Sequence, residues 1–109
     1  ANYIFNAPTE AKCSPTEYRK IVEAAWLKKL QDFRPQLVLI SAGFDGHKKD
    51  PMGELNLETE DYRWLTEMLV SVAHDHSNDR IISTLEGGYH LKALAESVAA
   101  HLDVLNAVY

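Results

Sequence analysis

Two short apolar runs, set between segments with helical periodicity, constrain the fold of this chain more than any other feature. The runs QLVLIS (36–41) and RIISTL (80–85) show no polar and apolar alternation, which is typical of parallel strands buried on both faces of a sheet. Apolar residues at helical spacing precede the first run, connect the two runs and follow the second. With a further short strand predicted at Tyr3 to Phe5, the order is βαβαβα. This order predicts the α/β class, with three αβα layers and a mostly parallel sheet joined by right-handed crossovers.

Three helices are predicted around these strands. The sequence Ser14-Pro15-Thr16-Glu17 has the form of a capping box with proline at the first helical position, and Arg34-Pro35 ends the helical pattern that follows. A second helix is expected over roughly 59–76. A third helix is expected from a stripe of aliphatic residues formed by Leu91, Leu94, Ala95, Val98, Leu102 and Leu105.

Length, composition and charge exclude several classes of protein. The chain has 109 residues, 46% of them hydrophobic and 25% charged, which describes one domain or part of one. The formal net charge of −5 argues against a nucleic-acid-binding surface and would favour the approach of a basic substrate. No apolar run approaches the roughly 20 residues of a membrane-spanning helix, and signal-peptide features are absent, so we expect a cytoplasmic protein. The single cysteine, Cys13, excludes an internal disulfide and is expected to be a loop thiol.

Polar, glycine-containing segments follow both predicted strands. Ser41–Asp50 follows the first strand and Glu86–His90 follows the second. Ligands of open parallel sheets bind outside the carboxyl ends of the strands, and a single helix links these two strands. We therefore expect the two segments to meet at one edge of the sheet, with Asp45 and Tyr89 close together in space.

The spacing of Asp45 and His47 leaves two interpretations open. In an extended segment, residues i and i+2 point to the same face, as they do in a D-x-H pair of metal ligands. Alternatively, Asp45 caps the following turn and His47 is a solvated loop residue. Asp50-Pro51 is expected to initiate a turn. Neither His90 nor His101 has a partner that the sequence identifies.

The sequence Glu86-Gly87-Gly88-Tyr89 leaves three interpretations open. It can form a plain turn between strand and helix. It can also bind a phosphate at the N-terminus of the next helix, although the full glycine-rich pattern of such sites is absent. In the third interpretation, the glycines let the backbone approach a substrate closely, and the Tyr89 hydroxyl donates a hydrogen bond to developing negative charge.

Two longer segments carry a family resemblance. RPQLVLISAGFDGHKKDPMGELNLETEDY and RIISTLEGGYHLKALAESVAAHL closely resemble the carboxyl-terminal part of the histone deacetylase superfamily. The likeness is closest to bacterial histone deacetylase-like amidohydrolases and acetoin-utilisation-type proteins, and it runs from about Asn6 to Leu105. The resemblance implies a partial arginase/deacetylase-like fold, in which residues 1–109 form the C-terminal segment of a single catalytic domain.

The same resemblance implies a zinc-dependent hydrolase that removes acetyl groups from acetyl-lysine or acetylpolyamines. The aspartate of SAGFD, here Asp45, is a zinc ligand in that family. The tyrosine of GGY, here Tyr89, polarises the acetyl carbonyl and stabilises the tetrahedral intermediate. The residues expected to line the substrate tunnel or its rim are Gly87, Gly88, Pro51 and Met52.

Several parts of the family's active site have no counterpart in this chain. The tandem histidines that act as general base and acid are absent, as are the upstream zinc ligands, and His47 is not a usual ligand of the family. Because a catalytic zinc needs three protein ligands and an open position, we expect the chain alone to be inactive. We also expect one sheet edge and its helix-facing surface to be uncovered, which could support homo-oligomers. The alternative function is a non-catalytic α/β binding or scaffold module.

Overall fold

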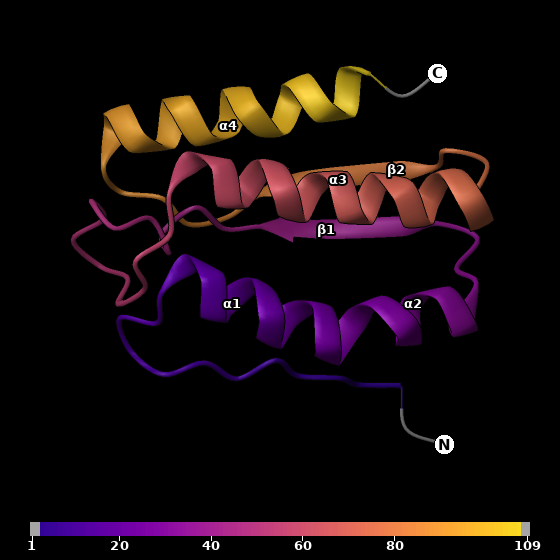
Figure 1. The fold of residues 1–109 in the computed structure, drawn as a ribbon. Helices are drawn as coiled ribbons and strands as arrows, with labels where there is room; N and C mark the ends of the chain where they lie inside the picture. Colours follow the sequence, from indigo (N-terminus) through magenta and orange to yellow (C-terminus); the bar gives the residue numbers. More distant parts are fainter. Residues whose placement is uncertain (1–2, 108–109) are drawn as a thin grey trace.

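The computed structural model describes residues 3–107 as an alternation of helices and strands (Figure 1). The elements in chain order are α1 (Pro15–Val22), η1 (Glu23–Leu27), α2 (Lys28–Phe33), β1 (Val38–Ala42), α3 (Thr59–His76), β2 (Ile81–Leu85) and α4 (Leu91–Asn106). The first three follow one another without a break, with η1 as a π-helical turn between two α-helical segments. Both apolar runs form strands, and all three predicted helices are present. No helix within the described range is long and apolar enough to cross a lipid bilayer.

The two strands form a parallel pair connected by α3. Their register runs from Val38 opposite Ile81 to Ala42 opposite Leu85. Beyond the strands, the Glu86 N–H donates to the Ala42 carbonyl at 2.9 Å. Figure 1 shows both strands ending on the side of the molecule where α3 and α4 begin. The α/β class and the parallel sheet predicted from the sequence are therefore confirmed, and the loops that follow the two strands lie side by side.

Only one face of this sheet is covered within residues 3–107. On that face, Ile40 packs against the core cluster that includes Tyr62 of α3, and the Ser83 hydroxyl forms a hydrogen bond with His101 of α4. On the opposite face, Leu39 is 69% exposed and Ile82 is 55% exposed. The expectation that both strands are buried on both faces is wrong for the described residues, because their helices pack against one face only.

The strand predicted at Tyr3 to Phe5 is not formed. These residues are exposed and make no ladder with either strand. They run along the first helix instead: the Trp26 indole N–H donates to the Phe5 carbonyl at 2.7 Å, and the Lys29 ammonium lies 4.5 Å from the centre of the Phe5 ring. The sheet within residues 3–107 consists of β1 and β2 alone, and a segment that pairs with neither is not part of it.

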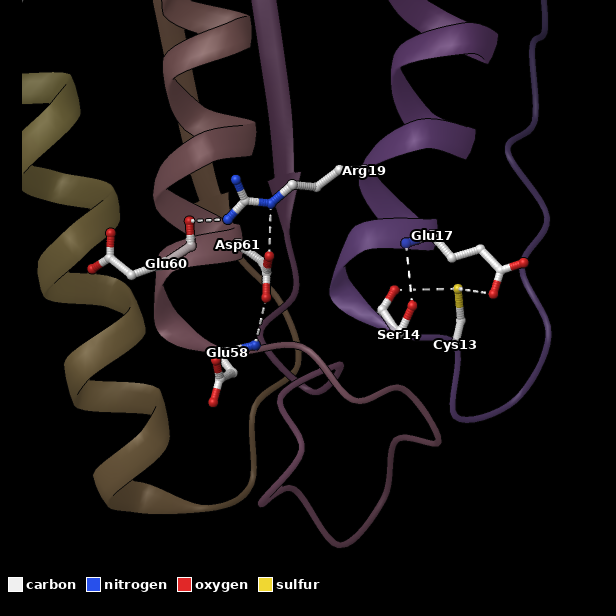
Figure 2. Close-up of polar contacts among 7 residues, drawn as sticks. All are labelled: Cys13, Ser14, Glu17, Arg19, Glu58, Glu60 and Asp61. Carbon is white, nitrogen blue, oxygen red and sulfur yellow. Dashed lines mark hydrogen bonds and ion pairs between the residues drawn. The ribbon is translucent and has the colours of Figure 1, made fainter.

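The first helix begins where its capping sequence predicts. The Ser14 hydroxyl oxygen accepts a hydrogen bond from the Glu17 N–H at 3.2 Å (Figure 2). At the other end, Arg34 adopts a left-handed conformation with φ of 55° and terminates α2 before Pro35. Cys13 lies in the loop before α1, as expected, and its thiol is within 4.0 Å of the Glu17 carboxylate. Burial and the nearby Glu17 and Glu10 carboxylates raise the pKa of Cys13, which disfavours a reactive thiolate.

A buried carboxylate fixes the start of α3 directly after the long loop. Asp61 accepts a hydrogen bond from the Glu58 backbone N–H at 2.8 Å and pairs with the Arg19 guanidinium of α1 at 2.8 Å (Figure 2). Arg19 also donates to the Glu60 carbonyl at 3.3 Å. Since Asp61 is almost completely buried, these contacts tie α1 to the first turn of α3 and hold the end of residues 43–57 in place.

The buried face of α4 differs from the predicted leucine stripe. Leu91 and Leu102 are exposed, although Leu94 and Val98 pack against the core as expected. The most buried positions of the helix are instead Ala93, Ser97, Ala100 and His101. Small side chains let α4 lie close against α3, and this close packing determines which face of α4 is buried.

Candidate functional site

The Asp45 carboxylate lies between two glycines, one from each loop at the carboxyl end of the sheet. A Cβ added to Gly87 would be 2.7 Å from Asp45 Oδ2, and a Cβ added to Gly43 would be 3.2 Å from Oδ1. The Phe44 N–H donates to the Gly87 carbonyl at 2.7 Å and holds the two loops together. The prediction that the two polar segments meet at one edge is therefore confirmed. The sequence offered close approach to a substrate as one reason for the glycines; at Gly87 the group that a side chain would meet is the Asp45 carboxylate.

This carboxylate has the chemistry of a metal ligand. Within residues 3–107, no hydrogen bond or ion pair occupies it. Carboxylate oxygen suits a divalent metal such as zinc, and a partly buried, unpaired carboxylate that leaves no room for a Cβ on Gly87 fits that role. Across the same residues, no cluster of three His, Cys, Asp or Glu side chains could hold a metal ion. The described residues thus offer one candidate ligand for such a centre.

Asp50 joins the two loops at a second point. Its Oδ2 accepts a hydrogen bond from the Tyr89 backbone N–H at 2.7 Å. Its Oδ1 accepts from the N–H groups of Met52 at 2.8 Å and Gly53 at 3.2 Å, which forms the turn predicted for Asp50-Pro51. The sequence identified the turn but not the contact with Tyr89, because nothing local signals a partner 39 residues away.

The other candidate residues surround this contact. Tyr89 is 56% exposed, and Pro51 and Met52 are exposed as well, so all three present surface at this end of the molecule. Gly88 has φ of +147°, a conformation that favours glycine, and a Cβ there would be 2.6 Å from Leu94 Cδ1, so the Leu94 side chain would have to move.

The structure contradicts both interpretations of the spacing of Asp45 and His47, the extended D-x-H pair and the solvated loop histidine. Residues 45 and 46 form a turn, so the extended geometry of a D-x-H pair is absent. His47 is only 5% exposed, so it is not a solvated loop residue either. Its Nδ1 accepts a hydrogen bond from the Lys49 N–H at 3.1 Å. Burial, with a smaller effect from Lys49 and Lys48, lowers the pKa of His47 and favours the neutral ring.

Two further polar groups lie in the core beneath the site and were not identified from the sequence. His101 bridges the hydroxyls of Thr66 and Ser83, both at 2.8 Å. The Tyr62 hydroxyl is buried without a hydrogen-bond partner within residues 3–107, and burial raises the pKa of Tyr62. Both side chains line a cavity of about 260 Å³ that also reaches Asp45. The sequence gave no sign of these roles, because the residues that surround Tyr62 and His101 come from other helices and strands.

Comparison with known proteins identifies the family. The histone deacetylase domain model matches residues 1–105. The chain is 39% identical to type-2 histone deacetylase 1 of Dictyostelium discoideum over 103 residues, covering 94% of this chain and 7% of that protein. It is 43% identical to the human polyamine deacetylase HDAC10 over 74 residues, covering 68% of this chain and 10% of that protein. The structure of the histone deacetylase Clr3 superimposes with a TM-score of 0.84 at 27% identity, over 95% of this chain and 17% of that one.

These matches agree with the likeness carried by SAGFD, DP and EGGY. The chain spans a small part of each of these relatives, and the matched region contains Asp45, Asp50 and Tyr89. Sequence identity, the family match and the superposition all lead to the same assignment. The chain therefore belongs to the histone deacetylase family.

Proposed function

We propose that this chain is the C-terminal segment of a zinc-dependent deacetylase domain that hydrolyses acetyl-lysine or acetylated small amines. The observation that supports this function best is the Asp45 carboxylate, unpaired within the described residues and held between Gly43 and Gly87 beside the loop that carries Tyr89. The same arrangement follows from the family's motifs, in which Asp45 is a metal ligand and Tyr89 acts on the substrate.

In this proposal Asp45 supplies one ligand to zinc, and the remaining ligands and the general base come from residues outside this chain. Zinc, when bound, would act as a Lewis acid toward the acetyl carbonyl. The contribution of the chain is to hold the Asp45 carboxylate at a fixed position. Gly87 contributes by having no side chain, because a Cβ there would be 2.7 Å from Oδ2 and would displace the carboxylate from its observed position.

Tyr89 is proposed to act on the substrate directly. Its phenol O–H would donate a hydrogen bond to the acetyl oxygen as negative charge develops there, a role that is worth most when the donor is already in position. The ring is 56% exposed, so a substrate can reach it. Gly87 and Gly88 would flank the bound acyl chain, and Pro51 and Met52 would form part of the rim.

The relatives and the charge of the chain support the proposed substrate class. One relative is named as a histone deacetylase and another as a polyamine deacetylase, and both names describe the deacetylation of an amine. A net charge of −5 would favour the approach of a lysine-containing peptide or a polyamine, each of which carries positive charge around the acetylated nitrogen.

The test of this function uses the complete catalytic domain that contains this chain. The wild-type domain should release acetate from a fluorogenic acetyl-lysine substrate or an acetylpolyamine, and a chelator should abolish the activity. Tyr89→Phe should lower kcat by about 100-fold or more while leaving bound zinc unchanged, since it removes one donor to the developing charge. Unchanged turnover in Tyr89→Phe would exclude the assigned role.

The isolated 109-residue chain should behave differently. It should show no chelator-sensitive hydrolysis, and the exposed sheet face around Leu39 and Ile82 should promote self-association. Gel filtration showing a monomer at every concentration would contradict the second expectation. The alternative function, a non-catalytic α/β binding module, predicts that the complete protein is also inactive with added zinc. The cytoplasmic location and the absence of nucleic-acid partners stay predictions from the sequence.

A further inference from the structure

Asp50 is a buried acid with contacts that serve two loops at once. Only 8% of its surface is exposed. Its Oδ1 closes the local turn through Met52 and Gly53, whereas its Oδ2 accepts a hydrogen bond from the Tyr89 backbone N–H at 2.7 Å. No lysine, arginine or histidine forms an ion pair with it within residues 3–107.

Backbone N–H groups are what hold this carboxylate in its charged form. Burial raises the pKa of Asp50, but the hydrogen bonds from the N–H groups of Tyr89, Met52 and Gly53 outweigh burial and leave the pKa below its usual value. An ionised carboxylate only accepts hydrogen bonds, and it can do so at both oxygens, whereas a carboxylic acid carries an O–H donor and an amide has an NH2 donor in place of one oxygen. Hydrogen bonds to an ionised acceptor are also stronger than neutral ones, so the contact with Tyr89 is a firm one.

The position of this contact gives it a consequence for the site. Gly88 precedes Tyr89 and lacks a side chain that could anchor the backbone, and the Tyr89 ring itself is more than half exposed. The Gly87 carbonyl on one side of Tyr89 accepts from the Phe44 N–H at 2.7 Å, and His90 on the other side caps α4. Between these two anchors the Tyr89 N–H itself is held by Asp50, which belongs to the loop that also carries Asp45. One loop thus holds the candidate metal ligand and, through Asp50, the backbone of the candidate hydrogen-bond donor.

We propose that Asp50 is a positioning residue: its carboxylate locks the Tyr89 backbone to the Asp45 loop and so sets where the Tyr89 hydroxyl meets the substrate. This inference rests on the function proposed above. It predicts that Asp50 acts on turnover through Tyr89 and has little effect on metal binding, because its contacts are with the turn and with Tyr89 rather than with Asp45.

The main test replaces the carboxylate by its isosteric amide in the complete domain. In Asp50→Asn, one amide oxygen remains to accept a hydrogen bond, and the NH2 group must face a backbone donor. Turnover should fall by about 10- to 100-fold, in line with the cost of a small misplacement of a catalytic group, with KM and zinc content nearly unchanged. Glu54→Gln is the matched control, since it removes an exposed charge from the same loop. Its turnover should equal that of the wild type.

A double-mutant cycle separates positioning from a general structural effect. If Asp50 acts through the Tyr89 hydroxyl, Asp50→Asn should cost less than about threefold in a Tyr89→Phe background, where that hydroxyl is already gone. An equal loss in both backgrounds would overturn the proposal. So would an Asp50→Asn enzyme with the turnover of Glu54→Gln, or one that loses its zinc together with its activity.

A measurement on the unmodified protein tests the contact even if Asp50→Asn does not fold. The Tyr89 amide hydrogen should exchange with solvent at least about tenfold more slowly than in an unstructured peptide, although its ring is exposed. Exchange at the unprotected rate would overturn the proposal. If the wild-type domain proves inactive, the proposed function fails, and amide exchange still decides whether Asp50 holds Tyr89.

Discussion

Replacing Gly87 by alanine tests the proposed role of Asp45 as a metal ligand. The new Cβ would be 2.7 Å from Oδ2, 2.9 Å from Cγ and 3.2 Å from Oδ1 of the Asp45 carboxylate. Gly87 does not have a positive φ, so alanine introduces a steric effect without backbone strain. The substitution therefore acts on one group, the carboxylate proposed to bind zinc.

The size of the displacement follows from these distances. Ordinary contact begins at 3.4 Å, so the Oδ2 atom must move by 0.7 Å, which is 3.4 minus 2.7 Å. A side chain can make this movement by rotation, at a cost of about 1 kcal/mol, so folding should be affected little. Ligand distances in a metal site tolerate only about 0.2 Å, so zinc binding should be affected strongly. We expect zinc affinity to fall by about 10- to 100-fold.

The assay is a zinc titration of the complete domain against a competing chromophoric chelator, with Tm measured on the metal-free protein. Gly43→Ala is the graded control, because its Cβ would need a shift of only 0.2 Å, which is 3.4 minus 3.2 Å. It should weaken zinc binding by less than about threefold. Equal zinc affinity for Gly87→Ala and wild type would refute Asp45 as a ligand. Equal losses in the two alanine variants would refute the steric reasoning.

Three other substitutions test the structure around the site, each by urea denaturation of the complete domain. Burial lowers the pKa of His101 from its ordinary 6.5, so the unfolded chain binds the proton before the folded chain does as the pH falls. The free energy of unfolding should therefore be full above about pH 7 and decline below it. In His101→Gln the part of this pH dependence that comes from His101 should be missing. Gly88→Ala should destabilise by about 1 to 3 kcal/mol, through its φ and its contact with Leu94, and a smaller loss would contradict this. Asp61→Ala should also cost about 1 to 3 kcal/mol, because Arg19 and the start of α3 lose their acceptor; a midpoint equal to wild type would show that the pair adds nothing.

Local sequence signals account for most of the secondary structure. Ser14 and Pro15 determine where the first helix begins, and Arg34-Pro35 determines where it ends, because both ends depend on the conformations of neighbouring residues. The second helix, Thr59–His76, begins and ends as predicted. Tyr3 to Phe5 was predicted incorrectly, since a strand exists only where another strand supplies its hydrogen bonds.

Part of the candidate site could also be predicted from the sequence. The motifs SAGFD and EGGY single out Asp45, Gly87 and Tyr89, and the strand order places them at one edge, because parallel strands carry their carboxyl ends to the same side. The sequence by itself thus determined the family and the class of fold, and it named the residues of the candidate site.

Only the tertiary structure decided how those residues are held. The local sequence predicts only a turn at Asp50, yet its Oδ2 accepts a hydrogen bond from the Tyr89 N–H, 39 residues later. The sequence identifies no partner for His101, yet its two ring nitrogens form hydrogen bonds with the hydroxyls of Thr66 and Ser83. Hydrogen bonds of this kind join atoms that are distant along the chain and close in space, and their partners are defined only when the elements have packed.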